Sequence, residues 1–344
     1  MDKNLVTQKY YGDVLKKSSD LKTNACCTME SIPDFIKQKL KNIHTDILDS
    51  YYGCGLVVPD CLQNMNVLDL GCGTGRDVYL LSQLVGENGQ VVGVDMTENQ
   101  LNKAKTFQTY HQEKFQHNKS NVDFRMGNIE NIDDLKFYFN FDVVVSNCVV
   151  NLCQNKEKVL NNVYNILKTG GEFYFSDVYS SKRVPKELLN DDVLWGECLG
   201  GALYWNDFIN LAKKCGFTDP RLVKSNLITI RNKELEKKVG DIKFYSATYR
   251  LFKLPELLES DCEDYGQAVI YKGTIENNLS YWDLDNHHRM LTNKIFLVCG
   301  NTNTMLYNSR FKNHFEFLGD FKTHYGIFNG CGKQIPFEEN SGCC

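Results

Sequence analysis

Residues 67–76, which read VLDLGCGTGR, constrain the fold more than any other part of this chain of 344 residues. An apolar run ends there in a loop whose glycines alternate with small residues. Gly71 and Gly73 have no Cβ, so their backbone can adopt positive φ and approach a ligand closely. A second apolar run, VVGVD, ends at Asp95, the usual place for an acid that accepts hydrogen bonds from ribose hydroxyls. The two segments together predict a site for a nucleoside-containing cofactor.

Strand-like and helix-like stretches alternate through the first half of the chain, which is typical of a doubly wound α/β sheet. Short runs rich in β-branched and aromatic residues begin at Val67, Val91, Val122, Phe141 and Gly171. Upstream, isoleucine and leucine recur at intervals of three and four, which predicts one amphipathic helix over residues 32–48 packed on the sheet. The residues of this stripe are Ile32, Ile36, Leu40, Ile43 and Ile47.

Charge and hydropathy disfavour two classes of partner. The formal net charge is −4 and no long Lys/Arg run is present, so we expect no nucleic-acid substrate. No stretch approaches the ~20 apolar residues of a membrane span, and the amino terminus has no apolar signal region. We therefore expect a cytoplasmic protein that does not act at a membrane.

The chain has 14 cysteines, which is unusually many. In the cytoplasm thiols stay reduced, so this abundance indicates metal binding, catalysis or redox chemistry instead of a disulfide framework. No CxxC pair is present, so a thiol site has to be assembled from distant segments. Four positions next to glycines or strand ends stand out: Cys26 or Cys27, Cys54, Cys148 and Cys198. Each alone is also compatible with a small buried hydrophobic residue.

The glycine loop resembles that of the class I S-adenosylmethionine-dependent methyltransferases. Arg76 occupies the position where a nicotinamide-binding loop requires glycine, so a dehydrogenase fits poorly. In the methyltransferases the acid before the first glycine serves the methionyl end of the cofactor, and the acid that closes the second strand serves the ribose. The resemblance assigns these roles to Asp69 and Asp95.

Over most of its first 250 residues the chain resembles the arsenite S-adenosylmethionine methyltransferases. The matching segments include TNACCT, YYGCGLVVPD, LDLGCGTGRD, VVSNCVVNL, LKTGGEFYFSDVY and VLWGECLGGALYW. The resemblance implies a class I Rossmann-like core over residues 1–183, an arsenic-binding segment over 184–255 and a small α+β domain over 256–344. It also implies arsenite and methylated trivalent arsenicals as substrates, and glutathione or a thioredoxin-type protein as reductant.

The family's substrate cysteines fall on Cys54, Cys148 and Cys198, which would hold trivalent arsenic. Cys26, or its neighbour Cys27, would be the amino-terminal redox thiol, and Cys26 keeps the TNxC spacing. Arsenic is a soft centre that prefers thiolate ligands. The cofactor residues implied by the resemblance are Tyr52, Asp69, Gly71, Gly73, Asp95, Met96, Asn128, Ile129, Glu130 and Asn147.

Two other functions remain open from the residues alone: a methyltransferase for a small organic molecule, and a non-catalytic thiol protein that binds a soft metal. Near the candidate cysteines, we expect Glu197 to lie at the surface or to cap a helix, and not to be catalytic. His287 and His288 lie in a polar stretch, and we expect both to be surface residues as well. A second cysteine group, Cys331, Cys343 and Cys344, ends the chain, and its role stays undecided.

Overall fold

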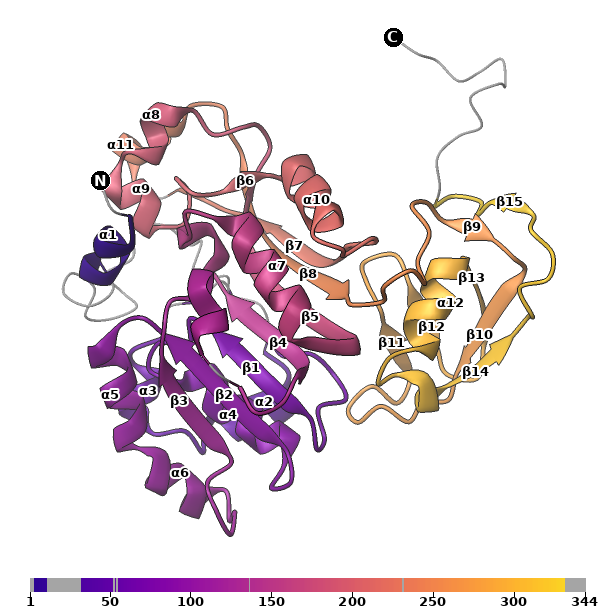
Figure 1. Cartoon of the computed structure of the whole chain (residues 1–344), viewed down its shortest axis with the longest axis horizontal. Coiled ribbons are helices and arrows are strands. Elements are labelled where there is room, and N and C mark those ends of the chain that lie inside the picture. The colour runs from indigo at the N-terminus through magenta and orange to yellow at the C-terminus, as the bar shows by residue number, and fades with distance from the viewer. Residues whose placement is uncertain are drawn as a thin grey trace.

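The computed structural model describes residues 3–10, 32–51, 53, 55–135, 137–230 and 232–331. Within them an eight-stranded sheet has the order β3-β2-β1-β4-β5-β8-β7, and β6 pairs with β5 (Figure 1). Strands β1 to β5 are parallel to one another, whereas β8 runs antiparallel to both of its neighbours, β5 and β7. The strands are β1 (Asn66–Leu70), β2 (Gln90–Asp95), β3 (Val122–Met126), β4 (Phe141–Asn147), β5 (Leu167–Ser180), β6 (Leu203–Tyr204), β7 (Arg221–Leu227) and β8 (Phe244–Phe252).

Helices cover both faces of this sheet, because successive strand residues point to opposite sides. On β4, Val143 and Val145 pack in one core, and Val144 between them packs in the other. The core around Val143 is covered by α2 (Asp34–Leu40), α3 (Thr45–Leu48), α4 (Arg76–Val85), α5 (Glu98–Thr106) and α6 (Gln108–Lys114). The core around Val144 is covered by α7 (Lys156–Ile166) and α10 (Trp205–Lys214). The expected class I doubly wound fold is confirmed.

The single helix expected over residues 32–48 is wrong, because the stripe is divided between α2 and α3. His44 is the N-cap of α3, where its Nδ1 accepts a hydrogen bond from the Asp46 N–H at 3.2 Å. Its own N–H donates to Nε2 of His111 at 3.2 Å, so a contact with a distant segment fixes the break. The core role of the stripe holds, since Ile36, Ile43 and Ile47 are buried.

The segment between β5 and β7 builds a third apolar cluster beside the carboxyl ends of the strands. Its helices are α8 (Lys186–Leu189) and α9 (Asp192–Gly196), and α11 (Lys233–Val239) joins them from between β7 and β8. Helix α1 (Lys3–Lys9) packs against α9 (Figure 1). The expected boundaries at residues 183 and 255 stay a prediction, and β6, β7 and β8 from the segment between them extend the main sheet.

A small α+β unit follows β8 and has its own core, which includes Tyr271, Trp282 and Phe311. Its three-stranded antiparallel sheet has the order β13-β10-β14. The elements are β9 (Glu263–Asp264), β10 (Gln267–Tyr271), β11 (Tyr281–Asp283), β12 (Arg289–Leu291), β13 (Ile295–Val298), α12 (Gly300–Tyr307), β14 (Phe315–Leu318) and β15 (Gly326–Ile327). The expected small carboxyl-terminal domain is therefore present.

Buried charges join this domain to the main sheet. Glu172 of β5 is fully buried and forms ion pairs with Arg250 of β8 and with Arg310, which follows α12. The Arg310 Nε–H also donates to the carbonyl oxygen of Asp60 at 2.8 Å. One carboxylate thus links two strands of the sheet to the carboxyl-terminal domain.

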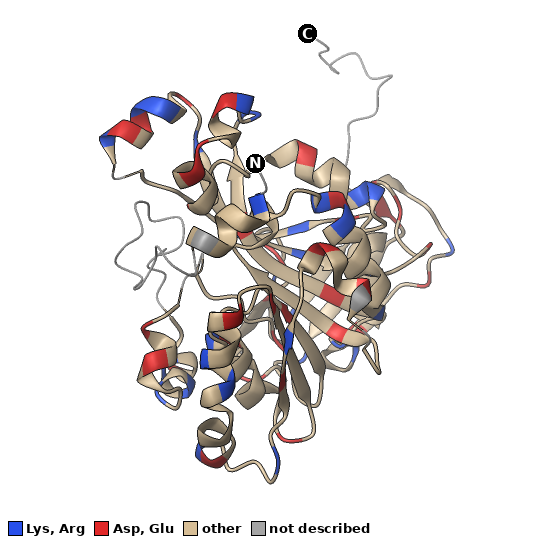
Figure 2. Ribbon diagram, turned by 60° about the vertical axis from the view of Figure 1, so that its left-hand side comes forward, with Lys and Arg blue, Asp and Glu red and all other residues tan. Residues whose placement is uncertain are grey.

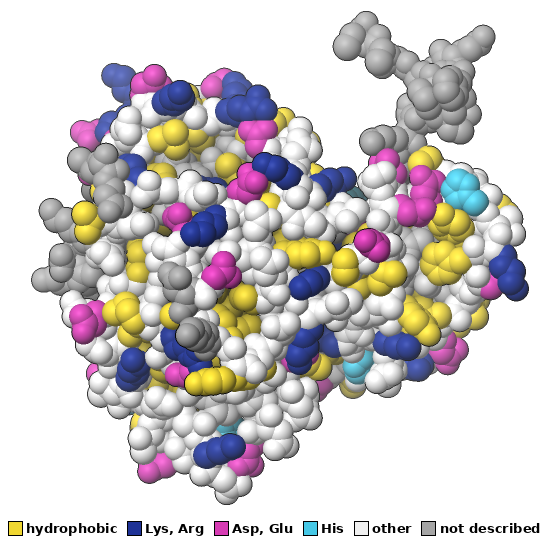
Figure 3. All heavy atoms as spheres, in the orientation of Figure 1, with side chains coloured by type: hydrophobic (Ala, Val, Ile, Leu, Met, Phe, Trp, Pro, Cys, Tyr) yellow, Lys and Arg dark blue, Asp and Glu magenta, His cyan; other side chains and the backbone are white. Residues whose placement is uncertain are grey.

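Elsewhere, Lys and Arg are interspersed with Asp and Glu over most helices, whereas α1 carries only lysine and α3 and α9 carry only aspartate (Figure 2). Figure 3 shows the same mixture on one face, with hydrophobic side chains exposed among the charged ones over the carboxyl-terminal domain. In the described part of the chain, every helix is too short or too polar to cross a bilayer.

Candidate active site

The glycine loop between β1 and α4 borders an open cleft. Gly71, Gly73 and Gly75 have φ values of +74°, +53° and +84°, a region that L side chains rarely adopt. A Cβ on Gly71 would lie 2.5 Å from both methyl carbons of Val149, whereas a Cβ on Gly73 would meet nothing within 4 Å. Gly71 is thus fixed by close packing, and Gly73 presents bare backbone to the open space.

Carboxylates surround this loop. Asp95 accepts hydrogen bonds from the N–H groups of Gly73 at 2.9 Å and Thr97 at 2.8 Å, and burial raises its pKa. Burial also raises the pKa of Asp69, and the charges of Asp77 and Asp95 raise it further. Three acids and one guanidinium, that of Arg76, therefore face the cleft. Such a negative environment favours a positively charged ligand.

The cleft has a volume of about 980 Å³ including its opening. It brings together most of the expected cofactor residues from β1, β2, β4 and the turn after β3. Those that line it are Asp69, Gly71, Gly73, Asp95, Met96, Asn128, Ile129 and Asn147. Tyr52 lies outside the described residues. Glu130 is not part of the lining, and its carboxylate accepts hydrogen bonds from the N–H groups of Gln154 and Asn155 instead.

Two further lining residues, Tyr51 and Asp77, were missed in the sequence. Asn147 Nδ2 donates to the Tyr51 hydroxyl at 2.6 Å and to the Asp77 carboxylate at 3.2 Å. The Arg76 guanidinium lies 3.1 Å from the centre of the Tyr51 ring and donates from Nε to Asp77 at 2.8 Å. A sequence signal exists only for Asp77, an acid in the first turn of the helix after a glycine loop.

A buried thiol cluster adjoins the cleft. The Sγ atoms of Cys148 and Cys198 and a carboxylate oxygen of Asp177 all lie within 4.8 Å of one another. Cys198 Sγ donates to the carbonyl oxygen of Cys148 at 3.3 Å. Asp177 accepts hydrogen bonds from the N–H groups of Asn151 and Val178, and burial raises its pKa to about 6. Cys148 belongs to both the cluster and the cleft lining.

Both cysteines have an unusual backbone. Cys148, after β4, has a φ of +57°, and Cys198, after α9, has a φ of +62°. Non-glycine residues in this region are strained by roughly 1–3 kcal/mol each, and such strain concentrates at functional sites. Cys148 is disulfide-bonded, contrary to the expectation that all thiols are reduced, whereas Cys198 forms no disulfide. Cys148 must be reduced before it can bind a metal.

Helix α1 closes one side of the site. Asn4 and Thr7 line the cleft, and Gln8 Nε2 donates to the carbonyl oxygen of Met96 at 3.0 Å. On the thiol side, the Trp195 indole N–H donates to the Thr7 hydroxyl at 3.1 Å. The residue that follows the helix, Tyr10, donates to the Glu197 carboxylate at 2.9 Å. This helix thus bridges the cofactor edge of the sheet and the loop that carries Cys198.

The burial of two residues differs from an expected surface position. Glu197 has the other expected role, as the C-cap of α9, but it is fully buried and its carboxylate accepts a hydrogen bond from the Tyr10 hydroxyl. His288 is buried as well, with its Nδ1 2.7 Å from the carboxylate of Asp285. The expected thiols Cys26, Cys27 and Cys54 lie outside the described residues, as do Cys343 and Cys344.

Comparison with known proteins agrees with this arrangement. Residues 62–216 match the family described as "Methyltransferase domain", and residues 265–338 match the "Arsenite methyltransferase C-terminal domain". The chain is 53% identical to an arsenite methyltransferase of Aquipseudomonas alcaligenes over 98% of this chain and 99% of that protein. It is 48% identical to the arsenite methyltransferase of Homo sapiens over 90% of this chain and 82% of that protein.

A solved structure supports the same assignment. The X-ray structure of an arsenic(III) S-adenosylmethionine methyltransferase from Chlamydomonas reinhardtii superposes with a TM-score of 0.84 at 46% identity. The match covers 87% of this chain and 100% of that chain, and so includes both the sheet and the carboxyl-terminal domain. With its cofactor cleft and adjoining thiol pair, the chain belongs to the arsenite methyltransferase family.

Proposed function

We propose that this protein transfers a methyl group from S-adenosylmethionine to trivalent arsenic held by the thiolates of Cys148 and Cys198. One observation carries the proposal: Cys148 lies in the lining of the cofactor cleft and also within 4.8 Å of the other cluster atoms. A methyl donor in the cleft and a thiolate-bound acceptor would therefore be neighbours. Cys54, the third expected arsenic ligand, stays part of the proposal as a residue outside the described ones.

The cleft fits S-adenosylmethionine, whose cationic sulfonium supplies an electrophilic methyl group when bound. Asp95 would accept hydrogen bonds from the ribose hydroxyls, and Asp69 would serve the methionyl end. Asn128, Ile129 and Met96 line the same cleft and would contact the nucleoside. The carboxylates of Asp69, Asp77 and Asp95 complement the positive charge of the ligand. The open space beside Gly73 leaves room for its backbone to approach the ligand.

The protein's main contribution to the reaction is proximity. The lone pair of thiolate-bound arsenic is the nucleophile and carries no proton, so no general base is required. Cys148 and Cys198 would fix arsenic beside the cleft, and the surrounding apolar cluster, which includes Leu152, Trp195 and Leu199, excludes water. Holding two reactants in a productive geometry lowers the barrier by as much as ~7–11 kcal/mol. The Asp177 carboxylate is committed to two backbone N–H groups and supports the loop that carries Asn151.

Turnover would require thiol reductant. Methyl transfer raises arsenic from the trivalent to the pentavalent state, and a pair of protein thiols returns two electrons as they form a disulfide. Cys26 or Cys27 would be the amino-terminal partner in this step. Glutathione or a thioredoxin-type dithiol would then restore the thiols by exchange. The disulfide at Cys148 supports this part of the proposal, because the site has to be reduced before each round of binding.

The deciding experiment measures arsenite-dependent methyl transfer from S-adenosylmethionine under excess thiol. Parent protein is compared with Cys148→Ser, Cys198→Ser and the control Cys215→Ser, whose thiol is buried away from the site and donates to the carbonyl oxygen of Glu157. We expect the first two variants to lose methylated arsenic and to keep their cofactor affinity, and the control to match the parent.

Other outcomes identify the alternatives. Cofactor binding without methylated arsenic, but with turnover of a small organic acceptor, would favour the organic-substrate methyltransferase. Arsenic binding without cofactor binding would favour a non-catalytic soft-metal protein.

The proposal also includes a cytoplasmic location and the domain limits 1–183, 184–255 and 256–344. Limited proteolysis of the full chain tests those limits.

A further inference from the structure

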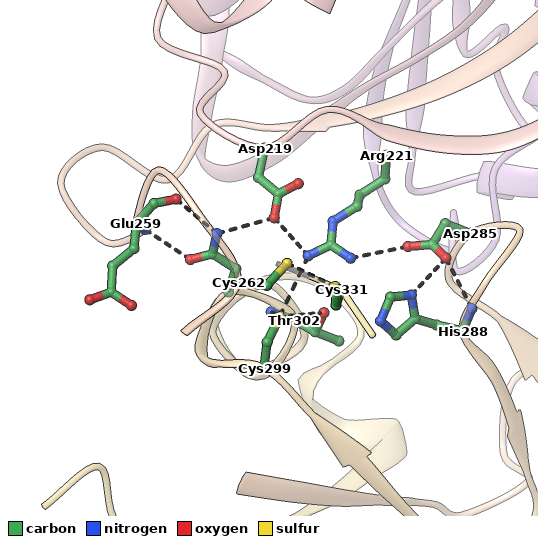
Figure 4. A network of polar contacts seen from close by, with 10 residues as sticks. Asp219, Arg221, Glu259, Cys262, Asp285, His288, Cys299, Thr302 and Cys331 are labelled. Atoms are coloured by element: carbon green, nitrogen blue, oxygen red, sulfur yellow. Dashed lines mark hydrogen bonds and ion pairs between the residues drawn. The ribbon is translucent and has the colours of Figure 1, made fainter. Parts of the chain in front are cut away.

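A second thiol cluster lies in the carboxyl-terminal domain, apart from the cysteines of the proposed methyl-transfer site. The Sγ atoms of Cys262, Cys299 and Cys331 all lie within 4.8 Å of one another (Figure 4). The Sγ atoms of Cys262 and Cys331 are 2.8 Å apart. All three cysteines are free thiols. They come from separate segments: one precedes β9, one caps α12, and one is the last described residue.

We propose that Cys262, Cys299 and Cys331 form a second binding site, in which three thiolates hold one trivalent arsenic atom. The three Sγ atoms lie within 4.8 Å of one another, a span that one soft ion with bonds of about 2.3 Å to sulfur can bridge, and the Cys262 and Cys331 Sγ atoms, 2.8 Å apart, would separate as they bind it. The proposal relies on the proposed function only for the identity of the ion. The site itself is separate from the cleft and from Cys148 and Cys198.

The packing around Cys299 fixes the position of its sulfur atom. Cys299 is 1% exposed and is the N-cap of α12, where its Sγ accepts a hydrogen bond from the Thr302 N–H at 3.4 Å. Nη2 of Arg221 lies 4.0 Å from the same Sγ. The sulfur of Cys299 is therefore held beside those of Cys262 and Cys331.

Charge and ligand number favour arsenic over zinc. Arsenous acid exchanges its three hydroxyl groups for three thiol sulfurs and releases three water molecules, so no electron is transferred and the product is neutral. The cation beside the cluster is already neutralised, because the Arg221 guanidinium forms ion pairs with two carboxylates, those of Asp219 at 2.7 Å and Asp285 at 3.2 Å. A neutral product therefore needs no further compensating charge. Structural zinc requires a fourth ligand. Among the described residues, the cluster contains three potential ligands and no His, Asp or Glu.

Occupancy of the site would crosslink the carboxyl-terminal domain. It would tie the segment before β9 and the end of the described chain to the first turn of α12. Arg221 belongs to β7, so the same cluster also touches the main sheet (Figure 4). We therefore expect arsenite to stabilise this domain as well as to occupy the methyl-transfer site.

The test measures arsenic retained per chain after reduced full-length protein is incubated with arsenite and desalted. It compares Cys299→Ser and Cys331→Ser with the control Cys61→Ser, a partly buried free thiol in contact with His314 at 3.5 Å. All variants are made both in the parent and in a Cys148→Ser/Cys198→Ser background. We expect Cys299→Ser and Cys331→Ser each to lose about one equivalent of arsenic in both backgrounds, and the control to lose none. Because Cys331 is exposed, its variant covers the case in which Cys299→Ser fails to fold.

The outcomes separate this inference from the proposed function. Unchanged arsenic in the Cys299→Ser and Cys331→Ser variants, together with normal methylation by the parent, would refute the second site alone. Loss of methylation only in the Cys148→Ser/Cys198→Ser background supports two independent sites. Retention of zinc in place of arsenic when both ions are offered would refute the identity of the ion. A Cys262–Cys331 disulfide that persists in excess reductant would refute the trithiolate.

Discussion

Replacing the buried carboxylate of Glu172 with an amide should weaken the link between the main sheet and the carboxyl-terminal domain. The Glu172 side chain is 0% exposed, and its partners Arg250 and Arg310 are 2% and 5% exposed. The Arg250 Nε lies 2.6 Å from the carboxylate. Glu172→Gln keeps the shape and removes the one charge that both guanidinium groups share.

The expected cost follows from burial. Removing one partner of a buried ion pair destabilises by about 3–5 kcal/mol, because the remaining charge is left without compensation. At about 2–4 °C per kcal/mol, the value for domains of 150–250 residues, the melting temperature should fall by roughly 10 °C. The matched control is Glu157→Gln, which breaks an exposed ion pair with Lys214 at 2.7 Å, whose side chains are 42% and 65% exposed. Such surface pairs contribute about 0–1 kcal/mol.

The assay is urea unfolding of parent and variants, with S-adenosylmethionine affinity measured under native conditions. We expect Glu172→Gln to lose stability and keep its affinity, since Glu172 does not line the cleft. In the double variant Glu172→Gln/Arg310→Gln, the loss should be at least ~1 kcal/mol smaller than the sum of the two single losses, because the residues are coupled. A loss no larger than that of Glu157→Gln would refute the reasoning.

Three further predictions concern the cleft and its support. Asp95→Ala should weaken S-adenosylmethionine binding about 10- to 100-fold, because hydrogen bonds to a charged group contribute about 1.5–3 kcal/mol. An unchanged Kd, measured by calorimetry, would show that Asp95 does not bind the ribose. Gly71→Ala should lower the melting temperature more than Gly240→Ala, since both have positive φ but only the first places its Cβ 2.5 Å from Val149 carbons. Burial lowers the pKa of His111 to about 4, below its value of about 6.5 in the unfolded chain. The stability that the neutral His111 side chain contributes is therefore present above pH 6.5 and is lost as the pH falls towards 4. After discounting for solvent screening we expect a loss of about 1–2 kcal/mol between pH 7 and 4.5, and a His111→Phe variant with the same pH dependence in urea unfolding would contradict this.

Local patterns were enough to predict strands β1 to β5 of the main sheet and its cofactor loop. Gly71 and Gly73 need positive φ in a turn only a few residues long, and Asp95 closes the strand next to that turn. Each of these requirements involves only a few neighbouring residues, so it can be recognised from a short segment of the sequence. The family resemblance, confirmed by the comparisons, added Cys148 and Cys198, which no local pattern brings together.

Long-range contacts decided what the sequence did not show. The break before α3 depends on a hydrogen bond between His44 and His111, and the burial of Glu197 depends on the Tyr10 hydroxyl. Neither contact follows from periodicity, because each joins segments that are far apart in the chain. The same holds for Tyr51, whose place in the cleft is set by Asn147.

The two thiol clusters show this division most clearly. The sequence by itself determined how many thiols the chain has, and that no close CxxC pair could bind a metal alone. Only the tertiary structure decided that Cys148 and Cys198 meet beside the cofactor cleft, and that Cys262, Cys299 and Cys331 meet in another domain. Several sulfur atoms bind one metal ion only when the distances and angles between them are suitable. For cysteines far apart in the sequence, those distances and angles are set only when the sheet and the carboxyl-terminal domain have packed.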